Sequence, residues 1–121
     1  MTNPSQPSLL LALDGSAPRF SLALADADGT VLAEEVLDQA AASRTLFAAL
    51  DRALSQAGAR RGDLAGIVAT RGPGSFTGVR LALAAALGLC QALGTEGAAV
   101  GSLEALAECA PPDAERVVAA I

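Results

Sequence analysis

The spacing of hydrophobic residues changes once along this chain, and that change limits the fold more than any other feature. Leu9–Leu13 is a continuous apolar run, which predicts a buried strand. Arg19–Ala25 alternates large apolar residues with smaller ones, so it is expected as a half-buried strand. A turn ending at Gly29 leads into a third strand over Thr30–Val36. Three successive antiparallel strands are therefore expected first.

After these strands the apolar residues recur at helical spacing. Leu46, Leu50 and Leu54 lie four residues apart, which places them on one face of a helix. Ser43 is the expected N-cap of this helix, and Gly58 is its expected C-terminal glycine. The remaining elements are expected, in order, as a strand over Leu64–Thr70, a helix from Thr77 to Leu93, a strand over Ala98–Val100, and a helix capped by Ser102 that runs to Cys109.

The resulting order, β-β-β-α-β-α-β-α, predicts an α/β fold with a mixed five-stranded sheet and helices on its faces. Residues 9–112 are expected to form this domain. Residues 1–8 are polar, contain two prolines and are expected to be a disordered leader, not a signal peptide. Residues 113–121 follow Pro111-Pro112 and are expected to begin a truncated second domain, with a strand over Val117–Ile121.

Histidine is absent from the 121 residues. This excludes a histidine-based catalytic triad, a histidine general base and the commonest metal ligand within the sequence. The formal net charge is −5 and all 8 basic residues are arginines without a basic stripe, a pattern unlike that of nucleic-acid binders. We therefore expect no catalytic residue, no bound metal and no direct binding of nucleic acid.

Two further features concern the compartment. Cys90 and Cys109 are far apart and no secretory signal precedes them, a pattern typical of reduced thiols in a cytoplasmic protein. The longest apolar run, Leu81–Leu87 with an extension to Cys90, is shorter than the ~20 residues that a membrane-spanning helix needs. No membrane association is expected.

A glycine-rich loop over Arg71–Gly78 stands between a predicted strand and a predicted helix, where backbone N–H groups and the helix dipole favour an anion. It lacks the lysine of a Walker loop and the last glycine of a dinucleotide fingerprint. Arg80 stands in the first helical turn, where a cation is unfavourable unless an anion or a partner's carboxylate offsets it. An Arg80 that faces solvent, or pairs with Asp14 or Glu104, is an equal alternative. The candidate residues, as a partner interface or an anion-binding loop, are Gly72, Gly74, Ser75, Thr77 and Arg80.

The helix after this loop is unusually apolar. No charged residue stands between Arg80 and Glu96, and the leucines in this stretch populate more than one helical face. The helix is either buried between the sheet and other helices or forms a protein–protein interface. We favour the interface, because monomers rarely expose large apolar patches. Leu83 and Leu87 are the candidate interface residues.

The segment from Gly72 to Arg80, Gly-Pro-Gly-Ser-Phe-Thr-Gly-Val-Arg, resembles the signature of the TsaB (YeaZ) family. Leu11-Ala12-Leu13-Asp14 is similar to the opening strand of that family, and Ile67-Val68-Ala69 leads into the loop as it does there. The resemblance covers about residues 9 to 121. It implies the N-terminal domain of an actin-like protein (ASKHA, ribonuclease H-like) that has two similar domains.

The resemblance also implies a function. TsaB-like proteins are non-catalytic scaffolds and activators in the synthesis of threonylcarbamoyladenosine beside the tRNA anticodon. They pair through helices of the N-terminal domain, either with TsaD, the catalytic subunit that holds the metal and nucleotide, or as homodimers, and the ATPase TsaE joins the complex. The resemblance implies no cofactor for the chain and contact with tRNA only through the complex. The catalytic relatives carry a His-x-x-x-His metal motif, which a chain without histidine lacks.

Two other functions stay open. The chain is alternatively part of an ATP-binding actin-like kinase or ATPase, in which Asp14 would lie near the metal of the nucleotide. In the simpler alternative, Asp14 only caps the turn that follows the first strand. A metallopeptidase, the third possibility, would need metal ligands that are missing from this sequence.

Overall fold

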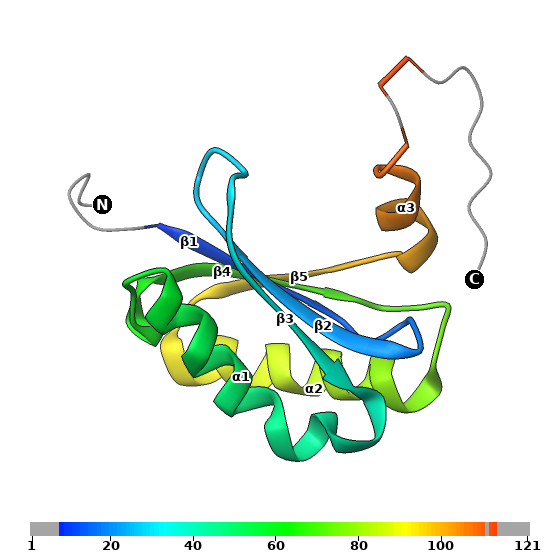
Figure 1. Ribbon diagram of the computed structural model, residues 1–121, viewed down its shortest axis with the longest axis horizontal. Helices are drawn as coiled ribbons and strands as arrows, with labels where there is room; N and C mark the ends of the chain where they lie inside the picture. Colours follow the sequence, from blue (N-terminus) through cyan, green and yellow to red (C-terminus); the bar gives the residue numbers. More distant parts are fainter. Residues whose placement is uncertain (1–7, 111, 114–121) are drawn as a thin grey trace.

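The structure is a computed structural model that describes residues 8–110, 112 and 113. It contains, in chain order, β1 (Leu9–Asp14), β2 (Arg19–Ala25), β3 (Val31–Asp38), α1 (Ala42–Gln56), β4 (Leu64–Thr70), α2 (Phe76–Leu93), β5 (Glu96–Val100) and α3 (Ser102–Ala107). Two short 3-10 helices, η1 (Gln39–Ala41) and η2 (Arg61–Asp63), precede α1 and β4. The predicted order of strands and helices is confirmed (Figure 1).

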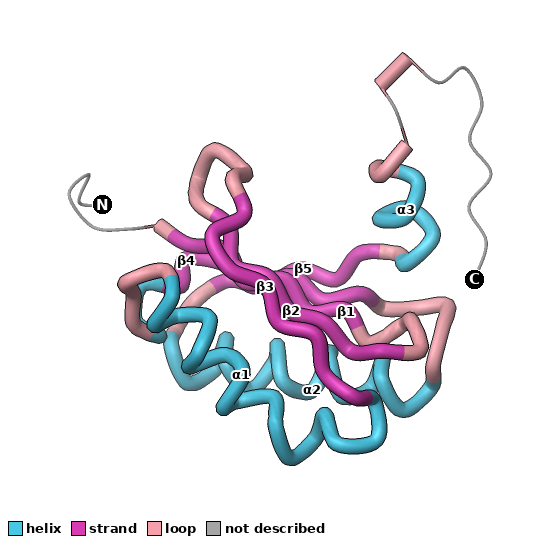
Figure 2. The backbone as a smooth tube through the Cα atoms, viewed as in Figure 1, coloured by secondary structure: helices cyan, strands magenta, loops and turns pink. Residues whose placement is uncertain are grey.

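The five strands form one mixed sheet in the order β3-β2-β1-β4-β5 (Figure 2). β1 pairs antiparallel with β2, and β2 pairs antiparallel with β3, as the short turns between them require. β4 is parallel to β1, and β5 is parallel to β4, because a helix carries the chain back across the sheet before each of them. The predicted α/β class and mixed sheet are confirmed.

The core lies between one face of the sheet and the helices α1 and α2, which both cover that face (Figure 1). Alternate strand residues supply the large core side chains, and all are at most 3 % exposed: Leu9, Leu11, Leu13, Phe20, Leu22 and Leu24. The helices supply many small ones, among them Ala49, Ala53, Ala82, Ala85 and Ala86. Small helix side chains let the helix backbones approach the sheet closely. Leucine and alanine side chains make up most of the core, and Phe20 is the one buried phenylalanine among the described residues.

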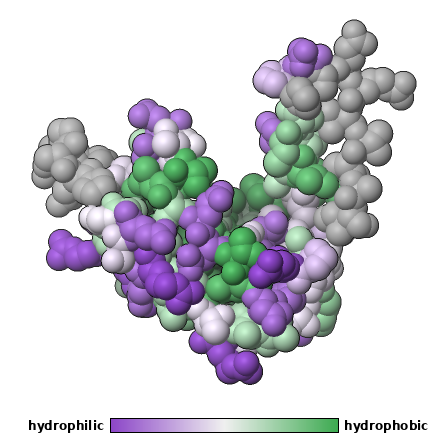
Figure 3. Space-filling model, viewed as in Figure 1, coloured by the Kyte–Doolittle hydropathy of each residue, from purple (hydrophilic) through white to green (hydrophobic). Residues whose placement is uncertain are grey.

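No described helix covers the opposite face of the sheet as α1 and α2 cover the first. Strand pairing aligns its residues in rows, one of which is Ala98, Val68, Ala12, Ala23 and Glu34. The short helix α3 stands on this side of the sheet, beyond the end of β5 (Figure 1). In the view of Figure 3, apolar surface gathers at the start of β3, where Val31 and Leu32 are exposed, and on α3, where Leu106 is exposed.

Two predicted helix caps are wrong. Ser43 does not cap α1, because η1 leads directly into the helix, and the residue at the cap position is Ala41, whose side chain has no hydrogen-bonding group. Asp38 takes the capping role one element earlier, where its side chain accepts from the N–H of Ala40. Ser102 is the first residue of α3, and Gly101 stands at its cap position. The strand expected over Ala98–Val100 begins two residues earlier, at Glu96.

Helix ends and chain ends account for the remaining differences. The last helix ends at Ala107, before the expected Cys109. The third strand extends to Asp38 because its pairing with β2 continues to Arg19. Apart from Ser8, the predicted leader lies outside the described residues, and so does the strand predicted over Val117–Ile121.

Candidate functional site

The glycine-rich loop between β4 and α2 packs against the turn between β1 and β2. The backbone N–H of Ser75 donates to the carbonyl oxygen of Ser16 at 3.0 Å. The Ser75 side chain caps α2, because its Oγ accepts from the N–H of Gly78 at 3.2 Å. At the start of the loop, the N–H of Ser102 donates to the carbonyl oxygen of Gly72 at 3.0 Å. These bonds fix the direction in which α2 leaves the sheet.

Two glycines are required where the turn meets the helix. A Cβ atom on Gly78 would overlap the carbonyl oxygen of Gly15, and a Cβ atom on Gly15 would overlap the backbone of Gly78. Gly74 lies against the same turn, and a Cβ atom there would stand 2.5 Å from atoms of Ser16. The glycines of the loop therefore allow a backbone-to-backbone contact within the chain.

Gln39 completes this contact. Its Nε2 donates to the carbonyl oxygens of Gly15 at 3.2 Å and Ala17 at 2.9 Å. Its Oε1 is buried without a hydrogen-bond partner in the described part of the chain. No local motif marks Gln39, because its hydrogen-bond partners are backbone atoms far away in the sequence.

The N-terminus of α2 is partly occupied by the chain itself. Its N–H groups at Gly78 and Val79 donate to Ser75, to the side chain at 3.2 Å and to the backbone carbonyl at 2.9 Å respectively. The carbonyl oxygen of Gly15 also lies against Gly78. These bonds hold the first turn of α2 against the loop and the turn after β1. The two predicted roles of the loop, a partner interface and an anion-binding site, both stay predictions.

Arg80 contacts an aromatic ring instead of a carboxylate. Its Cζ lies 5.0 Å from the centroid of the Phe76 ring, which is within cation–π range. Glu104, one of the acids considered as a partner, pairs with Arg71 at 3.4 Å. The other, Asp14, is bonded to Ser16 and Thr70. Across residues 8–110, 112 and 113, Arg80 takes part in none of the ion pairs.

The outward side of α2 is apolar along most of its length. Phe76 is 74 % exposed, Leu87 is 61 % exposed, and Leu83 lies half-buried between them. The neighbouring exposed residues Ala84 and Gly88 are small. We call Phe76, Arg80, Leu83, Ala84, Leu87 and Gly88 the α2 outer face. The structure thus brings the predicted residues Arg80, Leu83 and Leu87 onto one surface.

A groove runs beside the α2 outer face. It has a volume of about 290 Å³ and lies between α2 and the edge strand β5. Leu83, Leu87 and Cys90 form its helical wall, and the small residues from Gly97 to Ala99 form its strand wall. Gly72, Gly74 and Ser75 do not line it, because they pack in the loop at the start of the helix. Thr77 is exposed in the first turn of α2.

By length and composition, α2 is apolar enough to cross a membrane, with a mean hydropathy of 1.6 over 18 residues. The expectation that this segment is too short is therefore not supported. However, Ala82, Ala85 and Leu89 are buried on the side that faces the sheet. A core helix with this composition satisfies the same criterion, so hydropathy alone does not assign α2 to a membrane.

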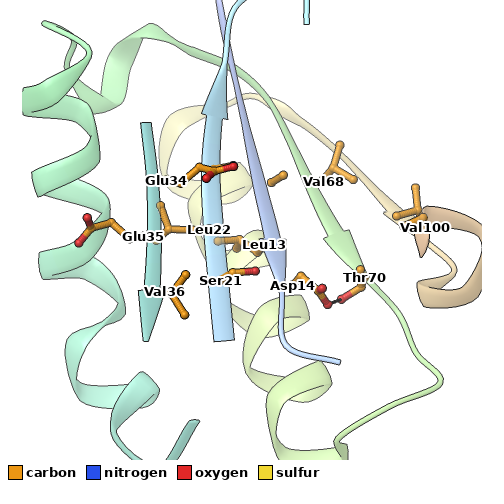
Figure 4. Close-up of a pocket in the computed structure, with 13 residues that line it drawn as sticks. Leu13, Asp14, Ser21, Leu22, Glu34, Glu35, Val36, Val68, Thr70 and Val100 are labelled. Atoms are coloured by element: carbon orange, nitrogen blue, oxygen red, sulfur yellow. Dashed lines mark hydrogen bonds between the residues drawn. The ribbon is translucent and has the colours of Figure 1, made fainter. Parts of the chain in front are cut away.

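Asp14 caps the turn after β1. Its Oδ1 accepts from the Ser16 N–H at 2.9 Å and from the Ser16 Oγ at 2.6 Å. The same Oδ1 accepts from the Thr70 Oγ1 at 2.9 Å (Figure 4). Burial by itself raises the pKa of Asp14, but these hydrogen bonds outweigh it and hold the pKa below its ordinary value. The turn-capping alternative is thus observed. Within the described residues, no three acidic, cysteine or histidine side chains gather as a metal site.

Comparison with known proteins identifies relatives of this arrangement. Residues 30–121 match the family model of TsaD, the tRNA N6-adenosine threonylcarbamoyltransferase. The structure is similar to YeaZ from Pseudomonas aeruginosa, with 35 % sequence identity and a TM-score of 0.73 over 83 % of this chain and 48 % of that chain.

A second solved structure is described as an uncharacterized protein with similarity to peptidase YEAZ from Pseudomonas aeruginosa. It shares 35 % identity at a TM-score of 0.71 over 79 % of this chain and 44 % of its own. The chain thus spans about half the length of both structures. No curated protein matches the sequence. The resemblance predicted from the loop and the opening strand is confirmed.

Proposed function

The chain belongs to the family that the TsaD model describes, as an N-terminal domain of the TsaB (YeaZ) type, and from this premise we propose that it is a non-catalytic subunit that binds a TsaD-type catalytic subunit through the α2 outer face. The similarity to YeaZ supports a role in the tRNA modification system. In this proposal the chain works in the cytoplasm, and it contacts tRNA only through the complex.

The observation that carries the proposal is the exposure of apolar side chains on the α2 outer face, which Arg80 alone interrupts with a charge. Phe76, Leu83 and Leu87 recur at helical spacing, with Phe76 and Leu87 more than half exposed. Fully burying such a side chain contributes about 1.5–3 kcal/mol, so leaving these side chains in water is costly in comparison with covering them. An exposed apolar patch of this kind marks an interaction surface.

The shape of the surface indicates what would cover it. Ala84 and Gly88 are small, so a partner backbone can approach α2 closely at those positions. The groove between α2 and β5 would receive apolar side chains from that partner. Two helices packed in this way interlock their side chains at an interaxial distance of about 8–10 Å. We therefore propose that the partner contributes an apolar helix.

The scaffold role is supported by the chemistry that the sequence lacks. None of the 121 residues is a histidine, so the metal motif implied for the catalytic relatives is missing from this chain. Asp14, the one carboxylate considered for nucleotide chemistry, is bonded to Ser16 and Thr70. The ATP-binding alternative predicts heat on titration of the chain with Mg-ATP, whereas the scaffold proposal predicts none. A TsaE-type ATPase would join the complex.

The interface is tested by placing a charge on the α2 outer face. Leu87→Glu should weaken binding to the TsaD-type subunit of the same organism by about 30-fold or more, because the charge would be buried at the contact. The matched control is Leu32→Glu, which places the same charge on an exposed leucine of β3. Affinity is measured by calorimetry, and circular dichroism confirms that both variants fold.

Homodimerisation is measured in the same series by sedimentation of the chain alone. If Leu87→Glu abolishes a dimer and leaves affinity for the TsaD-type subunit intact, the surface serves self-association instead. If both variants bind as the parent chain does, the proposed interface is wrong.

A further inference from the structure

Arg80 is the one charged residue of the α2 outer face. The other members of this face are apolar or small, and no charged residue follows Arg80 before Glu96. A partner that covers the face therefore covers this guanidinium as well. A charge that loses its water in this way weakens a complex unless an opposite charge or hydrogen-bond acceptors compensate it. The chemistry of the partner is thus restricted at Arg80, whereas it only has to be apolar at Leu83 and Leu87.

The described part of the chain supplies no ion pair to Arg80. Of the two acids considered as its partners, Glu104 pairs with Arg71, and Asp14 is bonded to hydroxyl groups of the turn and of β4. Arg80 also lies near the N-terminus of α2, where the helix dipole opposes a cation. Its position is thus locally unfavourable, and no described carboxylate offsets it.

Phe76 orients the guanidinium of Arg80 on the surface. The two residues are four apart in α2, so their side chains are neighbours on the helix, and the Arg80 Cζ lies 5.0 Å from the centroid of the Phe76 ring. Phe76 is 74 % exposed, so packing in the core does not explain it. A guanidinium over a ring keeps the N–H groups at its edge available to another acceptor. The pair therefore presents an oriented fork of donors on an otherwise apolar surface.

A carboxylate suits these donors better than a nucleic-acid phosphate. It accepts two parallel hydrogen bonds from a guanidinium and neutralises its charge. A phosphate would accept the same bonds, but a nucleic acid is held by several cations along its backbone. The α2 outer face carries a single cation, in a chain of formal net charge −5. A polypeptide that presents one carboxylate beside apolar side chains fits this surface.

We propose that the apolar helix of the TsaD-type subunit carries an aspartate or glutamate whose carboxylate accepts from the guanidinium of Arg80. This inference rests on the proposed α2 interface and adds the charge that its partner must present. Arg80 and Leu87 are about two helical turns apart, so the carboxylate lies about 10 Å along the helix from the residues that cover Leu87. Apolar contacts alone let packed helices slide, whereas a charge pair at one end fixes their register. Arg80 is thus a specificity-determining residue of the interface.

A series of substitutions at Arg80 tests the charge that faces it. The TsaD-type subunit of the same organism is titrated by calorimetry with the parent chain, Arg80→Lys, Arg80→Gln and Arg80→Glu. Lysine keeps the charge without the fork, glutamine leaves the carboxylate unpaired, and glutamate repels it. Affinity should therefore fall by about 3-fold, about 30-fold and about 100-fold or more, in that order. Arg19→Gln, at the exposed start of β2, is the matched control and should change affinity by less than about 2-fold.

Salt and stability make the result specific. Added salt screens attraction between charges, so the affinity of the parent chain should fall from low to high salt, and the affinity of Arg80→Gln should fall less. A glutamate near a helix N-terminus favours the helix, so Arg80→Glu alone should melt at the same temperature as the parent chain or higher. Weaker binding with unchanged or higher melting separates a lost contact from a lost fold.

The outcomes distinguish this inference from the interface on which it rests. If Leu87→Glu weakens binding while Arg80→Gln and Arg80→Glu bind as the parent chain does, the interface stands and the carboxylate is wrong. If substitutions at both positions leave binding unchanged, the interface itself is wrong. Equal losses in Arg80→Gln and Arg80→Glu would show that no anion faces Arg80 and would overturn the inference. A loss confined to the binding of tRNA by the assembled complex would assign Arg80 to a phosphate instead.

Discussion

The helices α1 and α2 cover the same face of the same sheet, but they meet water in different ways. α1 buries Leu46, Leu50 and Leu54 and turns two arginines and one acid outward. Phe47 is its one large apolar side chain in the outward group, at 43 % exposed. Two of the charged residues form ion pairs with other elements, Arg52 with Glu35 at 2.8 Å and Asp51 with Arg61 at 3.0 Å. α2 buries mainly alanines and turns Phe76 and Leu87 outward, with no charge after Arg80.

The contrast shows that packing against the sheet does not account for the composition of α2. α1 has the amphipathic pattern of a helix that is complete when one side is covered. In α2 three alanines face the sheet together with Leu89, whereas Phe76 and Leu87 face outward, although a solvated surface helix needs polar residues there. The described residues leave Phe76 and Leu87 exposed, and in our proposal a partner covers them.

The largest predicted difference concerns one leucine from each helix. Leu50 is 1 % exposed, so Leu50→Ala should lower the free energy of unfolding by about 2–5 kcal/mol through lost burial and a residual cavity. Leu87 is 61 % exposed, and Leu87→Ala should change the free energy of unfolding by less than ~0.5 kcal/mol. Urea unfolding followed by circular dichroism measures both, since the chain has no tryptophan. Equal losses would show that the outer side of α2 is part of the core.

A smaller difference in stability is expected between substitutions at the start of α2 and at the start of α1. Gly78→Ala should destabilise the chain by about 1–3 kcal/mol, because the new methyl group overlaps Gly15 and the amide of Gln39. Ser43→Ala should change stability by less than ~0.5 kcal/mol, because Ser43 lies inside the helix and caps nothing. Thermal melts of both variants provide the measurement. A loss of about 1 kcal/mol in Ser43→Ala would restore the cap that the sequence predicted.

The smallest difference is expected between the arginines Arg52 and Arg80. Arg52→Ala removes a partly exposed ion pair with Glu35 and should cost about 0.2–1 kcal/mol, less at high salt. In Arg80→Ala the loss of the Phe76 contact is balanced by the removal of a cation from a helix N-terminus, so the net change should be near zero. Unfolding in low and high salt separates the two. A salt-dependent loss in Arg80→Ala would reveal an acidic partner within the chain.

Much of this fold follows from local sequence. The alternation of large and small residues predicts the strand β2, and the four-residue spacing of Leu46, Leu50 and Leu54 predicts the helix α1. Both patterns repeat along the element, so one residue that departs from the pattern does not change the prediction. The caps at Ser43 and Ser102 were wrongly predicted because any serine near a helix start satisfies the local pattern. Local patterns do not mark Gln39, and they mark Ser102 only as a cap, because the contacts of both are made with residues distant in sequence.

The sequence by itself determined the α/β class, the order of the elements, the TsaB-type loop and the absence of histidine, because each of these is written in neighbouring residues or in composition. Only the tertiary structure decided that α1 and α2 share one face, that Gly15 meets Gly78, and that Thr70 donates to Asp14. These contacts join segments separated by many residues. Their geometry depends on how the whole sheet twists and packs, which no local pattern of residues encodes.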